Sequence, residues 1–432
     1  MNSAEIQGFG LSMLNKFASS EWPDKLRVRK PFERLLYTGS KNAFQLAGTL
    51  ARRFESNGTK LETKERLPPV SKGLFDLNLT EEQEMLRDTL RRFSTEVLRP
   101  AAHDADAEAK VPDEVRAQAA ELGLSFYAVP ESLGGVAAQL SVMTNALAAE
   151  ELGNGDLSLG AAILAPVGVA NAITRWGTKE QQGKYLPAFV GDKPPIATFA
   201  VVEAKPAFNP YELATTAKKS GSGYVLDGEK AIVLLGQEAE LFLVAARVDG
   251  KPAVFVVEGG AEGVTLRDEP AMGLKATATR RVRFEGTPAE KLGDDDFDYQ
   301  AFLDLGALGF CALAVGTCQA VLDYVVEYAN DRKAFGEPIS HRQSVAFLIA
   351  DMAIELDAMR MLVWKAASLA EQGKPFAREA FLARLLVAEK AMKIGNDGVQ
   401  LLGGHGYCKD HPVERWYRDL RSIAIVHSGL HL

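Results

Sequence analysis

The chain has 432 residues, which is enough for two or three domains. Hydrophobic residues make up 47% and charged residues 25%, the balance of an ordinary globular protein, and the net charge of −8 argues against nucleic acid as the main partner. The three cysteines show no disulfide framework and no metal spacing, no apolar run reaches the roughly 20 residues that span a bilayer, and no secretion signal opens the chain. We therefore expect a cytoplasmic protein without a metal site.

The first 75 residues differ in charge from the rest of the chain. Residues 1–75 contain 13 Lys and Arg against 7 Asp and Glu, so the remainder carries a net charge of −14. Two amphipathic stretches, 9–17 and 32–54, precede a Pro- and Gly-containing linker. Residues 1–55 suit peripheral contact with an anionic membrane or docking onto a partner, and the alternative is a pair of solvated helices that pack on their own protein.

Residues 76–195 have the pattern of an α-helical domain. Thr80 with Gln83 three residues later predicts a capping box at the start of a helix that Pro100 ends. Apolar residues at helical spacing predict further helices at 114–122, 140–152 and 179–189.

Residues 196–290 have the pattern of a small β-sheet or barrel, because short apolar runs alternate with Gly, Asp and Pro turns. From Tyr299 the helical period returns, so residues 291–432 are expected to form a helical domain, with long helices near 345–369 and 377–400. The predicted fold class is α+β. The expected strands are 196–202, 224–226, 231–235, 241–246, 253–257 and 281–284.

Three motifs in the C-terminal region carry a family resemblance: Asp331–Gly336 (Asp-Arg-Lys-Ala-Phe-Gly), Gln400–Tyr407 (Gln-Leu-Leu-Gly-Gly-His-Gly-Tyr) and Arg415–Asp419 (Arg-Trp-Tyr-Arg-Asp). With the helix–sheet–helix order, they resemble the acyl-CoA dehydrogenase family over residues 76–427. The resemblance implies an N-terminal helical domain, a middle β-sheet or barrel domain and a C-terminal four-helix bundle. It also implies FAD-dependent α,β-dehydrogenation of an acyl-CoA thioester. The charged residues of the third motif are expected to be structural.

The resemblance assigns the first two motifs to FAD binding. Arg332 can grip a pyrophosphate with two parallel hydrogen bonds, and the alternative is an ion pair with Asp331 or Glu337. Paired glycines let the backbone approach a dinucleotide, although by themselves they are typical of a helix C-cap. The residues assigned to FAD are Arg332, Phe335, Gln343, Gln400, Gly403 and Gly404.

Two segments of the middle domain depart from the family pattern. The family segment Thr-Glu-Pro-x-x-Gly-Ser-Asp aligns with Val202–Asn209, which keeps Glu203 but has Phe208 in place of the serine. The family strand Trp-Ile-Thr-x-Gly aligns with Ile232–Gly236, where Leu234 replaces the threonine. Hydroxyl donors at such positions stabilise reduced flavin. Either the flavin ring lies in a more apolar pocket here, or flavin binds weakly.

The position of the family's catalytic glutamate holds His427. Some members carry this glutamate on an earlier helix, where this chain has Gly306, so neither position supplies a carboxylate. Histidine has an ordinary pKa of about 6.5, which suits proton abstraction at neutral pH, and His427 is the candidate base. The alternative is a polar residue near the end of the chain with no catalytic role.

Two functional hypotheses follow. The first is an acyl-CoA dehydrogenase-like oxidoreductase that holds its acyl-CoA in a cleft between the helical and β domains, passes electrons to an electron-transfer flavoprotein and forms a homo- or hetero-oligomer. The second is a catalytically silent family member that serves as a structural or partner subunit of a hetero-oligomeric dehydrogenase. A variant of the first adds membrane association through residues 1–55.

Overall fold

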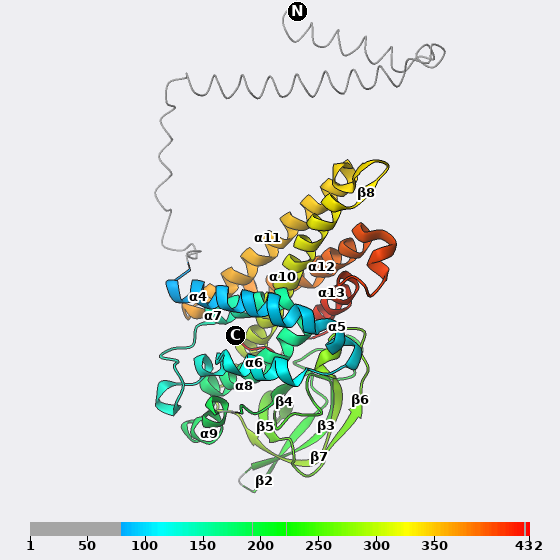
Figure 1. Cartoon of the computed structure of the whole chain (residues 1–432). Coiled ribbons are helices and arrows are strands. Elements are labelled where there is room, and N and C mark those ends of the chain that lie inside the picture. Colours follow the sequence, from blue (N-terminus) through cyan, green and yellow to red (C-terminus); the bar gives the residue numbers. More distant parts are fainter. Residues whose placement is uncertain (1–78, 192, 222, 427–428) are drawn as a thin grey trace, which may run out of the picture. The chain divides into compact units, whose positions relative to one another are not determined.

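The computed structural model describes residues 79–432 except 192, 222, 427 and 428 (Figure 1). The chain divides into two compact units, Met1–Leu74 and Phe75–Leu432, and everything below concerns the second unit. The predictions for the basic segment 1–55 and for the linker lie outside the described residues.

The N-terminal part is helical, as predicted. The capping box is present: the Thr80 hydroxyl accepts from the Gln83 N–H at 3.2 Å, and the Gln83 side chain accepts from the Thr80 N–H at 3.1 Å. The prediction that Pro100 ends this helix is wrong. A π-helical turn follows α4, and the helical chain continues through Pro100, which lies in the first turn of the next α-helix. The helices are α4 (Glu81–Phe93), the π-helix η1 (Ser94–Leu98), α5 (Arg99–Glu108), α6 (Asp113–Glu121), α7 (Val142–Gly155), α8 (Leu157–Trp176) and α9 (Lys179–Tyr185), with 3₁₀ turns η2 (Leu124–Ala128), η3 (Glu131–Leu133) and η4 (Leu186–Val190).

The middle part is a small barrel (Figure 1). Strands β4, β2, β3, β7 and β5 pair in that order, and β5 pairs back with β4, which closes the ring; β1 also pairs with β4 and β6 with β7. The two runs predicted at 224–226 and 231–235 are one strand, β3, interrupted by register shifts. The strands are β1 (Ala197–Ala200), β2 (Thr216–Ser220), β3 (Gly223–Val233), β4 (Leu241–Val248), β5 (Lys251–Glu258), β6 (Val264–Asp268) and β7 (Arg280–Lys291), and the 3₁₀ turn η5 (Lys275–Thr277) lies between β6 and β7.

The C-terminal part is the predicted helical bundle, built around a nearly buried central helix, α10. Helix α10 packs closely on α7: a Cβ added to Gly316 would lie 1.8 Å from the Glu150 carbonyl oxygen, so only glycine allows this approach. The elements are α10 (Tyr299–Asp331), the hairpin strands β8 (Lys333–Ala334) and β9 (Glu337–Pro338), η6 (Ile339–His341), α11 (Gln343–Glu371), α12 (Ala377–Leu402), η7 (Gly403–Tyr407), α13 (Val413–Leu420) and η8 (Arg421–Ala424).

In the part of the chain that the structure describes, two helices, α8 and α10, are long and apolar enough to cross a membrane by length and composition alone. The apolar segment of α8 is 83% buried inside the fold, and that of α10 is 89% buried. Burial of this extent is typical of core helices.

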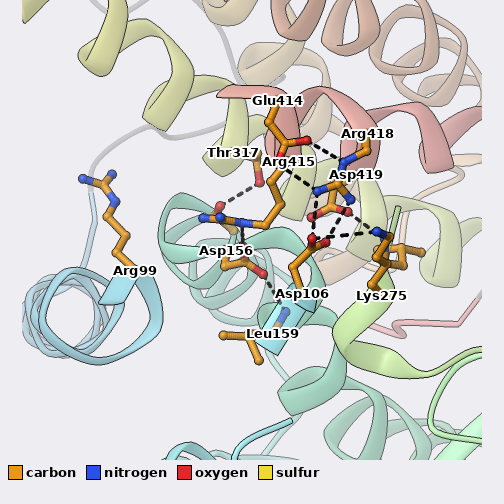
Figure 2. Close-up of polar contacts among 12 residues, drawn as sticks. Arg99, Asp106, Asp156, Leu159, Lys275, Thr317, Glu414, Arg415, Arg418 and Asp419 are labelled. Carbon is orange, nitrogen blue, oxygen red and sulfur yellow. Dashed lines mark hydrogen bonds and ion pairs between the residues drawn. The ribbon is translucent and has the colours of Figure 1, made fainter. Parts of the chain in front are cut away.

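A buried cluster of charges joins the three parts of the molecule (Figure 2). Arg418 of α13 binds both carboxylate oxygens of Asp106 on α5, at 2.8 and 2.9 Å. Arg415 of α13 lies 3.1 Å from Asp156, which caps α8. Asp419 accepts a 2.7 Å hydrogen bond from the N–H of Leu274 in the middle domain. The structural role expected for the third motif is confirmed, because α13 binds both other domains through it.

Candidate functional site

The first FAD motif forms the link between α10 and α11 at one end of the bundle (Figure 1). Arg332 is the exposed C-cap of α10, and no described residue forms a hydrogen bond or ion pair with its guanidinium. Glu337, the alternative partner, lies 3.8 Å from Arg342 instead. Phe335 is 94% exposed, and Gln343 is exposed at the start of α11. These side chains are therefore available to a ligand.

The second FAD motif ends α12 close to the first motif. Gly403 is the C-cap of α12 with φ of 59°, so the helix-cap reading is correct, and it does not exclude a binding role. Gln400, Gly403 and Gly404 are exposed, and a Cβ added to either glycine would meet nothing within 4 Å. The two motifs are joined by a 2.9 Å hydrogen bond between the Tyr328 hydroxyl, one turn before the end of α10, and Nδ1 of His405.

This end of the bundle fits the pyrophosphate and adenosine part of FAD. It offers a guanidinium without a partner among the described residues, two carboxamides and open backbone at two glycines, which are the groups that such a ligand engages. The surface is open, so a ligand bound here would remain accessible to a second protein surface.

Three segments of the middle domain meet beside the barrel. They follow β1, end β3 and include η5, and the first two contain the segments Val202–Asn209 and Ile232–Gly236 that align with the family pattern. The Ala231 N–H donates to the Val202 carbonyl at 2.9 Å, and the Leu235 N–H donates to the Thr277 carbonyl at 2.8 Å. Backbone hydrogen bonds therefore hold all three together.

Backbone strain is concentrated in these segments, which sequence reasoning missed. Of eight described non-glycine residues with positive φ, five lie here and a sixth is Phe335 of the first FAD motif. For a β-branched residue such as Ile232 this conformation is a true outlier. Strain of this kind persists where the surrounding structure enforces it, and it is common at functional sites. The five residues are Ala207 (φ 50°), Ile232 (52°), Leu235 (54°), Leu274 (55°) and Ala278 (43°).

Glu203, the residue kept from the family pattern, anchors the loop that follows it. Its carboxylate is buried and accepts hydrogen bonds from the N–H groups of Ala214 and Thr215 at 2.7 and 2.9 Å and from Lys230 at 2.8 Å. Burial lowers the pKa of Lys230 to about 8, and the ion pair with Glu203 opposes this shift. Glu203 therefore holds the loop at 214–215 against β3.

The two substituted positions line this region with apolar groups. Leu234 is buried, and Phe208 is half-buried against the core. Neither side chain can donate a hydrogen bond, so polar contacts from these two positions must come from the backbone.

The candidate base, His427, lies outside the described residues, but the chain on its far side is described. Leu430, three residues later, packs on α10: a Cβ added to Gly309 would lie 1.8 Å from the Leu430 carbonyl oxygen. Gly309 is one turn from Gly306 on the same helical face. The chain therefore meets α10 three residues after His427 and one turn from Gly306, the two positions at which the family carries its glutamate.

Asp304 does not take over the role of the missing glutamate at Gly306. Residues two apart on a helix do not share a face, so Asp304 and Gly306 point in different directions. The Gln300 side chain donates to both Asp304 oxygens at 2.9 Å, while burial raises the pKa of Asp304 to about 6.

The segment after His427 buries a histidine, His431, whose ring nitrogens have no hydrogen-bond partner. The ring stacks on Phe199 at 4.5 Å and lies 4.3 Å from Phe302. Burial lowers the pKa of His431 to about 3; the Phe302 backbone opposes this shift and Arg175 adds to it.

We expect His431 to make the protein acid-sensitive. The pKa of His431 in the folded protein lies below the ordinary value of about 6.5. Above a pH of about 6.5 its contribution to stability is therefore complete. As pH drops from there toward 3, the free energy of unfolding falls by about 1.4 kcal/mol per pH unit. His431→Leu should raise the free energy of unfolding at pH 5 by about 2 kcal/mol more than at pH 7.5, measured by urea denaturation. His103→Gln, at an exposed position on α5, is the control. An equal pH dependence in wild type and His431→Leu would contradict this account.

A helical domain, a closed barrel with strained segments beside it and a bundle whose end suits a dinucleotide are the architecture of a flavin-dependent oxidoreductase. The family models of the acyl-CoA dehydrogenase N-terminal, middle and C-terminal domains match residues 80–193, 198–287 and 298–429. The chain belongs to the acyl-CoA dehydrogenase family.

Individual relatives agree. The short-chain specific acyl-CoA dehydrogenase of Bos taurus mitochondria is 36% identical over 367 residues, which cover 82% of this chain and 88% of the relative. The butyryl-CoA dehydrogenase structure from Megasphaera elsdenii has a TM-score of 0.75 and 30% identity, and the match covers 82% of this chain and 96% of that one. A chain from a structure described as the electron transferring flavoprotein of Acidaminococcus fermentans has a TM-score of 0.75 and 31% identity, with coverage of 82% and 96%.

These findings confirm the predicted family, fold class and cofactor. The protein is an FAD-dependent acyl-CoA dehydrogenase-like oxidoreductase that acts on CH–CH bonds. The hypothesis of a silent partner subunit is not favoured, since the matched relatives are named as enzymes.

Proposed function

We propose that the protein oxidises a short-chain acyl-CoA thioester between Cα and Cβ, at the junction of its three domains. The observation that carries the proposal is that all three domains meet the chain that follows His427: Asn171 of α8 donates to the His431 carbonyl at 2.9 Å, and the His431 ring packs on Phe199 of β1 and Phe302 of α10. The short acyl chain is proposed because the Bos taurus and Megasphaera elsdenii proteins are named for short-chain and butyryl substrates.

His427 is the proposed base. Removal of the weakly acidic α-proton needs a base in its unprotonated form, and a neutral imidazole is available above a pH of about 6.5. FAD supplies the acceptor for the hydride that leaves Cβ. The return of the chain to α10 at Leu430 supports this role, since it brings the neighbourhood of His427 to the helix that carries Gly306.

Arg332 is the proposed ligand of the FAD pyrophosphate. Arg332→Gln should weaken FAD binding about tenfold or more, because a charge-assisted bidentate contact is lost. The measurement is the flavin absorbance of the purified protein and its titration with FAD. Arg378→Gln, at an exposed arginine at the other end of α12, is the control and should keep its flavin. Unchanged FAD affinity in Arg332→Gln would refute this assignment.

We also propose that the enzyme is an oligomer in which two copies complete each FAD site. Within one chain, the residues at the end of the bundle are separate from the three strained segments of the middle domain. An exposed apolar stripe on α11, with residues seven apart, supports a second copy as its cover: Phe347, Ile354 and Met361 are 60%, 67% and 38% exposed. Phe381 and Leu385 on α12 extend the apolar surface. Light scattering that found an FAD-loaded monomer would contradict the shared site.

An electron-transfer flavoprotein is the proposed acceptor of the electrons, supported by the similarity to a chain from the Acidaminococcus fermentans structure. A cytoplasmic location with peripheral membrane contact through residues 1–55 stays a proposal, based on the positive charge of that segment. Flotation with anionic vesicles, comparing the full chain with a variant that lacks residues 1–55, tests it; recovery of neither protein with the vesicles would exclude membrane contact.

A further inference from the structure

A cavity of about 570 Å³ lies where α4, η1, α7, α10 and α11 meet. It is distinct from the proposed FAD surface, because Asp323 on its wall precedes Arg332 by nine residues, about 14 Å along α10. Its lining is strongly charged. Four arginines and three carboxyl groups contribute: Arg87, Arg91, Arg99, Arg360, Glu150, Glu151 and Asp323.

Two of the four arginines are already neutralised. Arg91 binds Glu151 through two contacts of 3.1 and 2.7 Å. Arg360 lies 2.6 Å from Glu150. These two ion pairs form part of the cavity wall. Because the charges within each pair nearly cancel, neither offers a free positive charge to a ligand.

The other two arginines form no direct ion pair with a described carboxylate, although Asp323 attracts Arg99 and Glu151 attracts Arg87 at longer range. Nε of Arg87 is buried without any hydrogen-bond partner. Arg99 donates only to the Asn154 backbone and side-chain oxygens, at 3.2, 3.2 and 2.8 Å, and burial lowers its pKa. Figure 2 shows its guanidinium apart from the buried charge cluster. The remaining acid, Asp323, is engaged by Gln319 at 2.8 Å.

The π-helix keeps these side chains on one face. Arg87, Arg91, Thr95 and Arg99 are spaced by four residues, and in a straight α-helix each step of four rotates the side chain by about 40°, or about 120° from first to last. The π-helical turn Ser94–Leu98 has more residues per turn than an α-helix. It therefore reverses part of this rotation and keeps the row of side chains facing the cavity. π turns are rare and are frequent at functional sites.

We propose that this cavity binds a small phosphorylated ligand through Arg87 and Arg99. A phosphate dianion matches two guanidinium groups in charge and in hydrogen-bond geometry. The cavity volume leaves room for an organic group attached to the phosphate. Without a ligand, the buried Nε–H of Arg87 has no acceptor among the described residues, and a ligand oxyanion in the cavity would supply one.

The test measures the melting temperature of the FAD-saturated enzyme against inorganic phosphate and pyrophosphate at constant ionic strength. The wild type should show a saturable rise. Arg87→Gln should melt at the same or a higher temperature without ligand, bind at least tenfold more weakly and keep its FAD. Arg99→Gln should also bind more weakly.

Arg92→Gln is the matched control, because Arg92 is exposed on the same helix and does not line the cavity. It should bind as the wild type does. The proposal is overturned if the wild type shows no saturable rise, or if Arg87→Gln and Arg92→Gln bind equally well. A lower melting temperature of ligand-free Arg87→Gln would also overturn it, because Arg87 would then be structural.

Discussion

Asp156→Ala is expected to lower the free energy of unfolding by about 3–5 kcal/mol, because it leaves the buried guanidinium of Arg415 without a partner. Asp156 also caps α8, where its Oδ1 accepts from the Leu159 N–H at 3.0 Å, and loss of a cap adds about 1 kcal/mol. The measurement is urea denaturation at neutral pH, where the midpoint should fall sharply.

Asp419→Asn is the control from the same cluster (Figure 2) and should cost little. Burial and the nearby Asp156 raise the pKa of Asp419, whose Oδ2 has no partner. A pKa above the unfolded value of about 3.8 means that this group stabilises the fold at low pH and loses that contribution as pH rises. Asn keeps the acceptor for the Leu274 N–H, so the variant should equal wild type near pH 4, and its advantage over wild type should grow as pH rises from about 4 to about 8. A loss below about 1 kcal/mol in Asp156→Ala, or equal losses in both variants, would show that the cluster does not join the domains as described.

His427→Gln is expected to slow substrate-dependent flavin reduction by about 10²- to 10⁴-fold, the usual contribution of a positioned base. FAD content should not change, since the proposed FAD ligands lie elsewhere. In the wild type the rate should fall below a pH of about 6.5, as the imidazole becomes protonated, and this dependence should vanish in the variant. The measurement is stopped-flow bleaching of the flavin without oxygen.

His103→Gln serves as the control for His427→Gln and should reduce at the wild-type rate. If His427→Gln also reduces at the wild-type rate, the base is another group, and the assignment of His427 is wrong.

The helical parts could be predicted from the sequence because their signals are local. The Thr80 capping box and the start of α10 at Tyr299 depend on residues within one or two turns. The same local reasoning failed at Pro100, because it did not foresee a π turn that places proline at a tolerated position. Strands β2 and β6 were not predicted, since they are largely exposed and carry no apolar run.

The site was predictable only where a motif stays contiguous. Arg332, Gln400, Gly403 and Gly404 come from two motifs, Gln343 follows the first motif by seven residues, and the fold brings them to one end of the bundle. The strain at Ile232 and Leu235 has no sequence signature, because neither residue favours positive φ. The pairing of Leu430 with Gly309 joins residues 121 positions apart, so it depends on tertiary packing.

The most direct test of the account is anaerobic addition of butyryl-CoA to the purified protein while its visible spectrum is recorded. A working dehydrogenase should carry bound FAD, and its flavin band should bleach upon addition of the substrate. A protein that holds FAD but is not bleached by butyryl-CoA or other short-chain acyl-CoAs, or that binds no FAD at all, would contradict the proposed function.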